Sequence, residues 1–188
     1  MTEYPLVEAS KYGGYRTATD LDILAFRFPG AGKLASSRTQ TAATDSGVIS
    51  YAPDPALGCD PQQADMLIGE VKEGRAELNR AAHDPAVLEA ALSRFGCCGS
   101  DPAKVVVEAL QHHGHARTRS GHTIRQIVFG SSSGQNDAKG AKVVSLGHVR
   151  RFLQDFVREH WDILRQEQLK DPVLGFLVML EKAGKAPA

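Results

Sequence analysis

The residues best suited to chemistry on a phosphate ester are two carboxylates and a lysine, placed at the ends of apolar segments. Residues 66–68 form a short apolar run, Met-Leu-Ile, which continues as Gly69, Glu70, Val71 and Lys72. Such a run predicts a strand buried in a sheet. Because side chains alternate along a strand, Glu70 and Lys72 should point the same way. A charged pair at the end of a buried strand loses hydration, so it needs polar partners or a function.

A second carboxylate, Asp22, precedes another apolar run. Residues 20–26 read Asp-Leu-Asp-Ile-Leu-Ala-Phe, which predicts a strand with Asp20 and Asp22 on one face. Asp22 is preferred over Asp20 because the apolar run follows it directly. The two acids lie 48 positions apart (70 − 22), so only the fold can bring Asp22 to Glu70.

If the two strands are neighbours, they supply the oxygen ligands that Mg²⁺ prefers, from Asp22, Glu70 and the main-chain carbonyl of Val71. Lys72 could then hold or deprotonate the attacking water, or stabilise charge that builds on the phosphate. The same residues allow a purely structural interpretation, in which Glu70 forms an ion pair with Lys72 or with Arg16. Spacing alone does not separate the two interpretations, because Glu-x-Lys is a common tripeptide.

The elements that must position these residues follow from apolar periodicity and turn signals. Residues 6–13 are compatible with one or two helical turns, and residues 15–28 with one long strand or a pair of strands. Residues 30–64 are rich in Ala, Ser, Thr, Gly and Pro, with one strand-like piece at 47–51. We interpret this stretch as an insertion that folds over the site.

An Asp-Pro pair recurs at three places and predicts a helix start, with Asp as the N-cap and Pro in the first turn. The three helices begin at Asp84, Asp101 and Asp171. Between the second and third of them the pattern predicts strands at 122–129 and 141–146 and a long amphipathic helix at 147–165. The chain is therefore predicted to be a single α/β domain over residues 1–188, with a central mixed sheet flanked by helices.

Composition excludes several classes of protein. The chain has 188 residues, and its 22 Lys and Arg balance 22 Asp and Glu, which argues against a strongly basic nucleic-acid coat protein. Three cysteines, of which Cys97 and Cys98 are adjacent, are too few for a disulfide scaffold and favour a reducing compartment. No apolar stretch reaches the length of a membrane span, so we expect a cytoplasmic protein with no membrane partner.

The order of motifs along the first 75 residues carries further information. A segment with Glu8 is followed by Gly-Tyr, then by Asp22 with Ile-Leu-Ala, and then by Gly-Glu-Val-Lys ending at Lys72. This order resembles the PD-(D/E)XK nuclease superfamily, nearest in style to its Holliday-junction-resolvase and Mrr-like members. The resemblance covers about residues 6–75. The element between Asp22 and Glu70 is longer than the family's usual hairpin.

The resemblance implies an αβββαβ restriction-endonuclease-like core and a Mg²⁺ or Mn²⁺ ion held by Asp22 and Glu70. It implies that Lys72 is the catalytic lysine, and that Glu8 stands on a helix whose glutamate completes the metal shell. The implied substrate is nucleic acid, with DNA favoured.

Two other motifs point to weaker interpretations. Residues 28–33 suggest a phosphate-binding loop, but Arg27 and Leu34 stand where that pattern needs Gly and Ser or Thr, so a turn is preferred. The histidines at 112, 113, 115 and 122 lack the paired spacing of a zinc site and are interpreted as a solvated helix end.

The leading hypothesis is a Mg²⁺-dependent nuclease. The alternative is a catalytically inactive nuclease-fold module that binds nucleic acid or a protein partner, using the insertion at 30–64 or the arginine-bearing helix at 147–165. Arg117, Arg119 and Arg125 could line a nucleic-acid groove as well. A small-molecule phosphohydrolase with the same carboxylates is a third interpretation. The apolar helix predicted at 171–183 suits a homodimer interface as well as a core.

Overall fold

The computed structural model describes residues 4–9, 15–31, 53–60, 62–96, 100–132, 140–166, 169 and 171–185. For residues 4–9, 15–20, 81, 100–102 and 132 it describes the backbone alone. The chain, predicted as one domain, divides by its contacts into two compact units, Met1–Val144 and Ser145–Ala188. The strand-like piece predicted at 47–51 lies outside the described residues.

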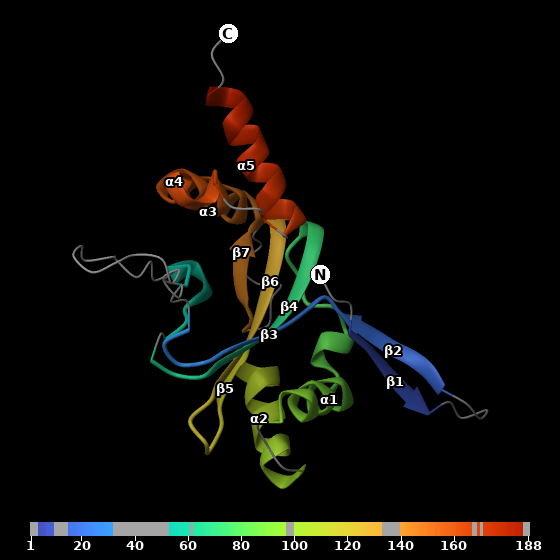
Figure 1. Ribbon diagram of the computed structural model, residues 1–188. Coiled ribbons are helices and arrows are strands. Elements are labelled where there is room, and N and C mark those ends of the chain that lie inside the picture. The colour runs from blue at the N-terminus through green and yellow to red at the C-terminus, as the bar shows by residue number, and fades with distance from the viewer. Residues whose placement is uncertain are drawn as a thin grey trace. The chain divides into compact units, whose positions relative to one another are not determined.

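Five strands of the first unit form a mixed sheet (Figure 1), as predicted for an α/β protein. The order is β3-β4-β6-β5, and β7 also pairs with β6. Strand β3 runs antiparallel to β4, β4 runs parallel to β6, and β5 runs antiparallel to β6. The strand bounds are β3 Ile23–Arg27, β4 Asp65–Arg75, β5 His115–Arg117, β6 Thr123–Ser132 and β7 Lys142–Ser145.

Helices α1 (Pro85–Phe95) and α2 (Ser100–His113) connect β4 to the β5–β6 pair. The start of α1 is as predicted, because the Asp84 side chain accepts a hydrogen bond of 2.8 Å from the Ala86 amide. Helix α2 begins at Ser100, so Asp101 lies in its first turn rather than at the N-cap. The apolar faces of both helices share one core with β4 and β6, which includes Met66, Ile68, Leu88, Leu92, Leu110 and Ile124. Two single turns, η1 (Pro55–Leu57) and η2 (Ala81–His83), flank β4 in the chain.

The helix predicted at residues 6–13 is wrong for its described part. Strands β1 (Tyr4–Ala9) and β2 (Tyr15–Leu21) pair antiparallel in a separate two-stranded sheet, in which Glu8 and Arg16 are register partners. A segment this short cannot sustain a helix without tertiary support. The aromatic and β-branched residues of the following stretch offer it a strand partner instead. Of the two alternatives for residues 15–28, the structure has the pair of strands, with the break at Asp22. The strand expected over residues 20–26 is therefore divided at Asp22.

The second unit contains α3 (Leu146–Glu159), α4 (Trp161–Leu164) and α5 (Pro172–Lys185). The single helix predicted at 147–165 is divided at His160, whose backbone leaves helical geometry at φ −104° and ψ 21°. The N-cap predicted at Asp171 is confirmed, because its side chain accepts a hydrogen bond of 2.8 Å from the Leu174 amide. The buried core of this unit is Val157, Leu164 and Val178.

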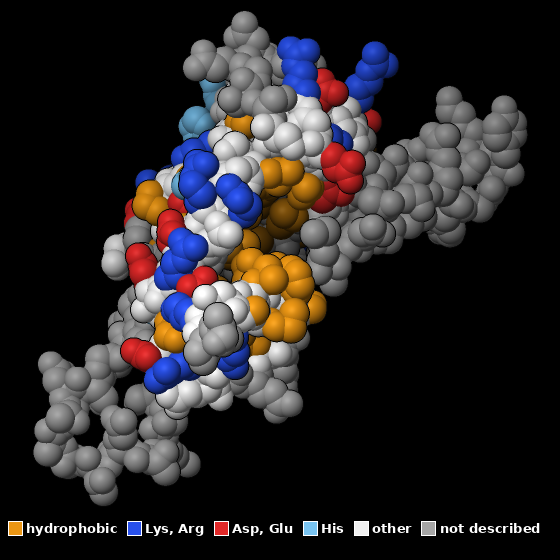
Figure 2. Space-filling view, turned by 90° about the horizontal axis from the view of Figure 1, so that it is seen from above, with side chains coloured by type: hydrophobic (Ala, Val, Ile, Leu, Met, Phe, Trp, Pro, Cys, Tyr) orange, Lys and Arg blue, Asp and Glu red, His pale blue; other side chains and the backbone are white. Residues whose placement is uncertain are grey.

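Helix α5 keeps four large hydrophobic side chains exposed: Val173, Phe176, Met179 and Leu180. Figure 2 shows a face of the molecule on which hydrophobic side chains gather, with Lys and Arg side chains beside them. The homodimer that this helix would suit stays a prediction. None of the helices among the described residues has the length and apolar character needed to cross a bilayer.

Gly114, which ends α2, is expected to tolerate no side chain. Its φ is +68°, and a Cβ atom there would overlap with the backbone of Gly140. The left-handed backbone costs a non-glycine residue about 1–2 kcal/mol, and forced packing adds about 1–3 kcal/mol. Gly114→Ala should therefore lower the free energy of unfolding by about 2–5 kcal/mol, measured from urea unfolding. The matched control is Gly121→Ala, since Gly121 has φ +86° but open space around it. Equal losses in the two variants would contradict the overlap.

Candidate functional site

Asp22 is positioned by the register between β3 and β4. Ile23 pairs with Gly69, so the continuing register brings Asp22 beside Glu70. Glycine suits this crossing, because a Cβ at Gly69 would lie 3.0 Å from the Ile23 Cβ and 3.0 Å from a methyl of Leu67, which is a tight approach. The Asp22 carboxylate accepts a hydrogen bond of 2.7 Å from the Val71 amide. An acid 49 positions earlier in the chain is thus attached to the strand that carries Glu70 and Lys72.

Glu70 and Lys72 form an ion pair at the same place on β4. The Lys72 Nζ lies 2.8 Å from Glu70 Oε2, with 31% of the lysine side chain and 3% of the glutamate side chain exposed. The ion pair of the structural interpretation is therefore present. Oε1 of Glu70 is buried and has no hydrogen-bond partner within the described part of the chain. A buried carboxylate oxygen without a partner is costly, so a ligand bound to this atom would offset part of that cost.

The three side chains together carry a net charge of −1, from Asp22, Glu70 and Lys72. The site is accessible through Asp22 and Lys72, which are partly exposed, while Glu70 is buried. Such a site suits a cation better than an anion, and the lysine adds a positive charge beside it.

The acids that sequence analysis proposed lie in different parts of the structure. Asp20 lies in β2, where it is the register partner of Pro5, and its side chain lies outside the described atoms. The Asp22 carboxylate contacts β4. Glu8 lies on β1 and not on a helix. The expectation that Glu8 is the helix glutamate of the metal shell is therefore wrong about the helix. The side chains of Glu8 and Arg16 lie outside the described atoms.

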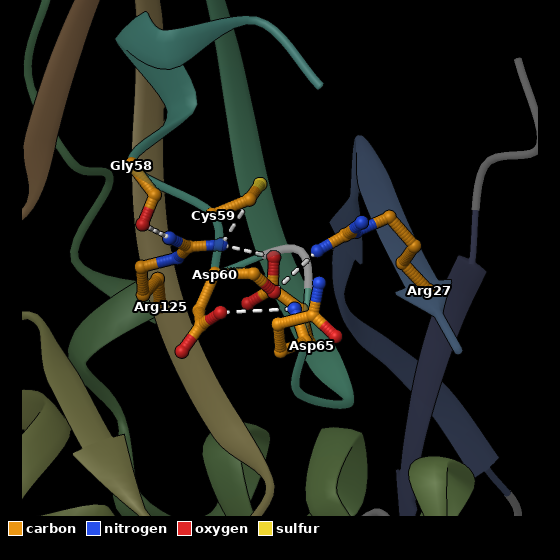
Figure 3. Close-up of polar contacts among 7 residues, drawn as sticks. Arg27, Gly58, Cys59, Asp60, Asp65 and Arg125 are labelled. Atoms are coloured by element: carbon orange, nitrogen blue, oxygen red, sulfur yellow. Dashed lines mark hydrogen bonds and ion pairs between the residues drawn. The ribbon is translucent and has the colours of Figure 1, made fainter. Parts of the chain in front are cut away.

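A second polar cluster was not found by sequence reasoning (Figure 3). Arg125 is buried on β6 and forms an ion pair with Asp65, which is also buried and lies at the start of β4. Its guanidinium also donates hydrogen bonds to the Gly58 carbonyl and, at 3.2 Å, to the Cys59 sulfur. Arg27, the cross-strand partner of Asp65, donates to the main-chain carbonyl of residue 60 at 2.5 Å. Two strands therefore hold the end of the insertion, residues 58–60, against the sheet.

Burial is the main cause of the shifted pKa of Cys59, the thiol in this cluster. It raises the pKa of the Cys59 thiol, and the hydrogen bond with Asp65 raises it further, against the opposing effect of Arg125. Cys59 therefore stays a protonated thiol near neutral pH and is a weak nucleophile. The interpretation of Arg125 as part of an exposed nucleic-acid surface is wrong, because its guanidinium is committed to Asp65 and Gly58.

The histidines near the end of α2 show no sign of a metal centre. His112, His113 and His115 are exposed, and a ring nitrogen of His115 lies 2.9 Å from the His113 carbonyl oxygen. In the described part of the chain, no group of three or more His, Cys, Asp or Glu side chains could hold a metal ion.

Comparison with known proteins gives no relative from which to transfer a function: no family model, no curated protein and no solved structure matches this chain. The function has to be argued from the residues around Asp22, Glu70 and Lys72.

Proposed function

We propose that this chain is a metal-dependent nuclease that hydrolyses phosphodiester bonds of DNA, with Asp22 and Glu70 as metal ligands and Lys72 as the catalytic lysine. The observation that carries the proposal is the hydrogen bond between the Asp22 carboxylate and the Val71 amide. It connects the Asp22 half of the motif to the Glu70 and Lys72 half, which lies far away in the sequence. A PD-(D/E)XK nuclease would require these two halves to lie side by side.

The strand arrangement supports the proposal. The strand that follows Asp22 lies antiparallel to the strand with Glu70, and after two helices β6 returns parallel to that strand. This agrees with the later part of an αβββαβ core, whereas the leading helix of that core is replaced by β1 among the described residues.

The residues present fit a hard divalent cation. Mg²⁺ is commonly held by one or two carboxylates, with water and substrate phosphate as its other ligands. Asp22 and Glu70 would supply the carboxylates, and the Val71 carbonyl a third oxygen. The unpartnered Oε1 of Glu70 is the atom that gains most from a cation. Bound there, Mg²⁺ or Mn²⁺ would polarise the phosphodiester and lower the pKa of a coordinated water.

The chain's own groups have separate roles in this proposal. The Val71 amide fixes the orientation of the Asp22 carboxylate. Glu70 holds the Lys72 ammonium at 2.8 Å, so the lysine is oriented before the substrate arrives. The exposed part of Lys72 can donate to a phosphate oxygen and stabilise the charge that develops in the transition state.

The test is cleavage of end-labelled duplex DNA, single-stranded DNA and RNA with Mg²⁺, with Mn²⁺ and with EDTA. Asp22→Asn keeps an acceptor for the Val71 amide and removes the charge, so we expect a normal fold and a loss of cleavage of at least about 100-fold. The control is Asp155→Asn, an exposed aspartate on α3, which should leave cleavage unchanged. Cleavage that needs no metal, or an Asp22→Asn variant as active as wild type, would overturn the proposal.

The catalytically inactive binding module is the second candidate. It is favoured by the ion pair and by the burial of Glu70, since a structural pair at a strand end would look the same. It predicts DNA binding without cleavage of any of the three substrates.

A further inference from the structure

Two phenylalanines at the far end of β3 remain exposed although the sheet beside them is well packed. Phe28 is 68% exposed and Phe26 is 41% exposed. Their ring centroids lie 4.5 Å apart with an interplanar angle of 82°, the edge-to-face geometry of a stable aromatic pair. Single exposed apolar residues are common on protein surfaces, but two large aromatic rings held together in solvent are an informative exception.

The backbone around this pair is well defined. Residues 28–31 form a tight turn, in which the Ala31 amide donates to the Phe28 carbonyl at 3.1 Å. Pro29 and Gly30 occupy its central positions, and Gly30 has φ +69°, as a type II turn requires. Arg27, between the two rings in sequence, is tied to residue 60 by its hydrogen bond. The rings are therefore presented from an ordered strand end and turn.

The aromatic pair lies along the strand that directly follows the proposed metal ligand. Strand β3 begins at Ile23, the residue after Asp22, and Leu24 and Phe26 share one face of it because side chains alternate. Phe26 pairs in register with Met66 on β4. Phe26 lies four positions after Asp22, which is about 13 Å at the rise of a strand. A polynucleotide with its reacting phosphate at Asp22 could thus place a base, a few nucleotides away, at the rings.

We propose that Phe26 and Phe28 form a stacking platform for an unpaired base, so that the substrate of the proposed nuclease has a single-stranded segment beside the cleaved bond. This inference rests on the proposed function for its choice of partner. Every base has a π-face, so stacking on phenylalanine tolerates any sequence. In a continuous duplex the bases are stacked on each other, and only single-stranded, tailed or junction DNA offers one at no unpairing cost. Strand β3 also lies at the edge of the described sheet, where a flexible strand can approach.

The experiment measures binding in EDTA, where no metal-dependent cleavage occurs. The probes are a fluorescein-labelled oligo-dT, a blunt duplex, and the same duplex with a single-stranded tail, and the readout is fluorescence anisotropy. Phe28→Ala should weaken binding of the oligo-dT and the tailed duplex by about 5- to 150-fold, which corresponds to the ~1–3 kcal/mol of one base stack. Binding of the blunt duplex should change little.

Val105→Ala is the matched control, because Val105 on α2 is 67% exposed and its truncation also removes exposed apolar surface. It should bind all three probes as wild type does. Phe28→Trp should retain binding, and its indole fluorescence should be quenched by oligo-dT. The inference is overturned if Phe28→Ala behaves like Val105→Ala, if it weakens blunt-duplex binding equally, or if wild type binds none of the probes.

The two proposals fail separately. Metal-dependent cleavage that depends on Asp22, together with no effect of Phe28→Ala, would reject the stacking platform and keep the nuclease. Binding that depends on Phe28, without cleavage of any substrate, would reject the nuclease and keep the platform.

Discussion

Arg125→Met is expected to lower the free energy of unfolding by about 3–5 kcal/mol, because it leaves a buried carboxylate without its counter-charge. Arg125 and Asp65 are 9% and 6% exposed in their side chains and form a direct ion pair. The same guanidinium also donates to the Gly58 carbonyl and to the Cys59 sulfur. Methionine keeps much of the apolar volume and loses every one of these donors, so Gly58 and Cys59 should lose their attachment to β6, while Arg27 still holds residue 60.

The cause can be isolated with a double-mutant cycle over Arg125→Met and Asp65→Leu. Replacing both charges leaves no unpaired ion. The double variant should therefore lose less free energy of unfolding than the sum of the losses in the two single variants. Unfolding should be followed by far-UV circular dichroism, because the only tryptophan, Trp161, lies in the second unit. Arg165→Met, at an exposed ion pair with Asp162, is the control and should change stability by no more than about 0.5 kcal/mol. Additive losses in the cycle would show that the pair is not coupled.

Local signals in the sequence were sufficient to predict those elements whose ends are determined by a few neighbouring residues. The helix start at Asp84 was correct because the N-cap hydrogen bond to Ala86 involves residues two positions apart. Asp171 was correct for the same reason. Residues 6–9 were assigned wrongly, because their secondary structure depends on pairing with β2 and not on their own propensity.

The candidate site was predictable in part. Strand alternation correctly placed Glu70 and Lys72 together. The Asp22 carboxylate contacts β4, and the preference for Asp22 over Asp20 as the metal ligand stays a prediction. The second cluster was out of reach because it needs the register of three strands at once. Arg27 lies opposite Asp65, and Arg125 lies opposite Leu67. Each of these residues is charged, and charged residues are normally assigned to the exposed surface.

The Phe26–Phe28 pair shows a different limit of sequence reasoning. Phenylalanines that follow an apolar strand are normally assigned to a core. Only the structure shows that β3 lies at the edge of the described sheet and that Phe26 and Phe28 are exposed. Exposure, and not residue type, is what makes the pair a candidate for binding.

Lys72→Met is expected to reduce DNA cleavage by about 10²–10³-fold, the size found when one preorganised donor to a transition-state charge is removed. The ammonium is held by Glu70 and reaches solvent, so methionine removes the charge without filling the site with a larger group. Binding of uncleaved DNA in EDTA should change far less than the cleavage rate, because a donor to the transition state acts mainly on kcat. Lys104→Met, at an exposed lysine of α2, should cleave as wild type does.

The structural interpretation of the ion pair makes the opposite prediction, and the variant Glu70→Gln with Lys72→Met separates the two. Lys72→Met alone leaves Glu70 buried and unpaired, so part of any lost activity could come from lost stability. The double variant removes that unpaired charge, and its melting temperature should return toward that of the wild type. If Glu70 and Lys72 are both only structural partners, cleavage should return together with stability. If Lys72 acts on the substrate and Glu70 on the metal, the double variant should stay inactive although its stability is restored. The charges that perform the chemistry would still be missing.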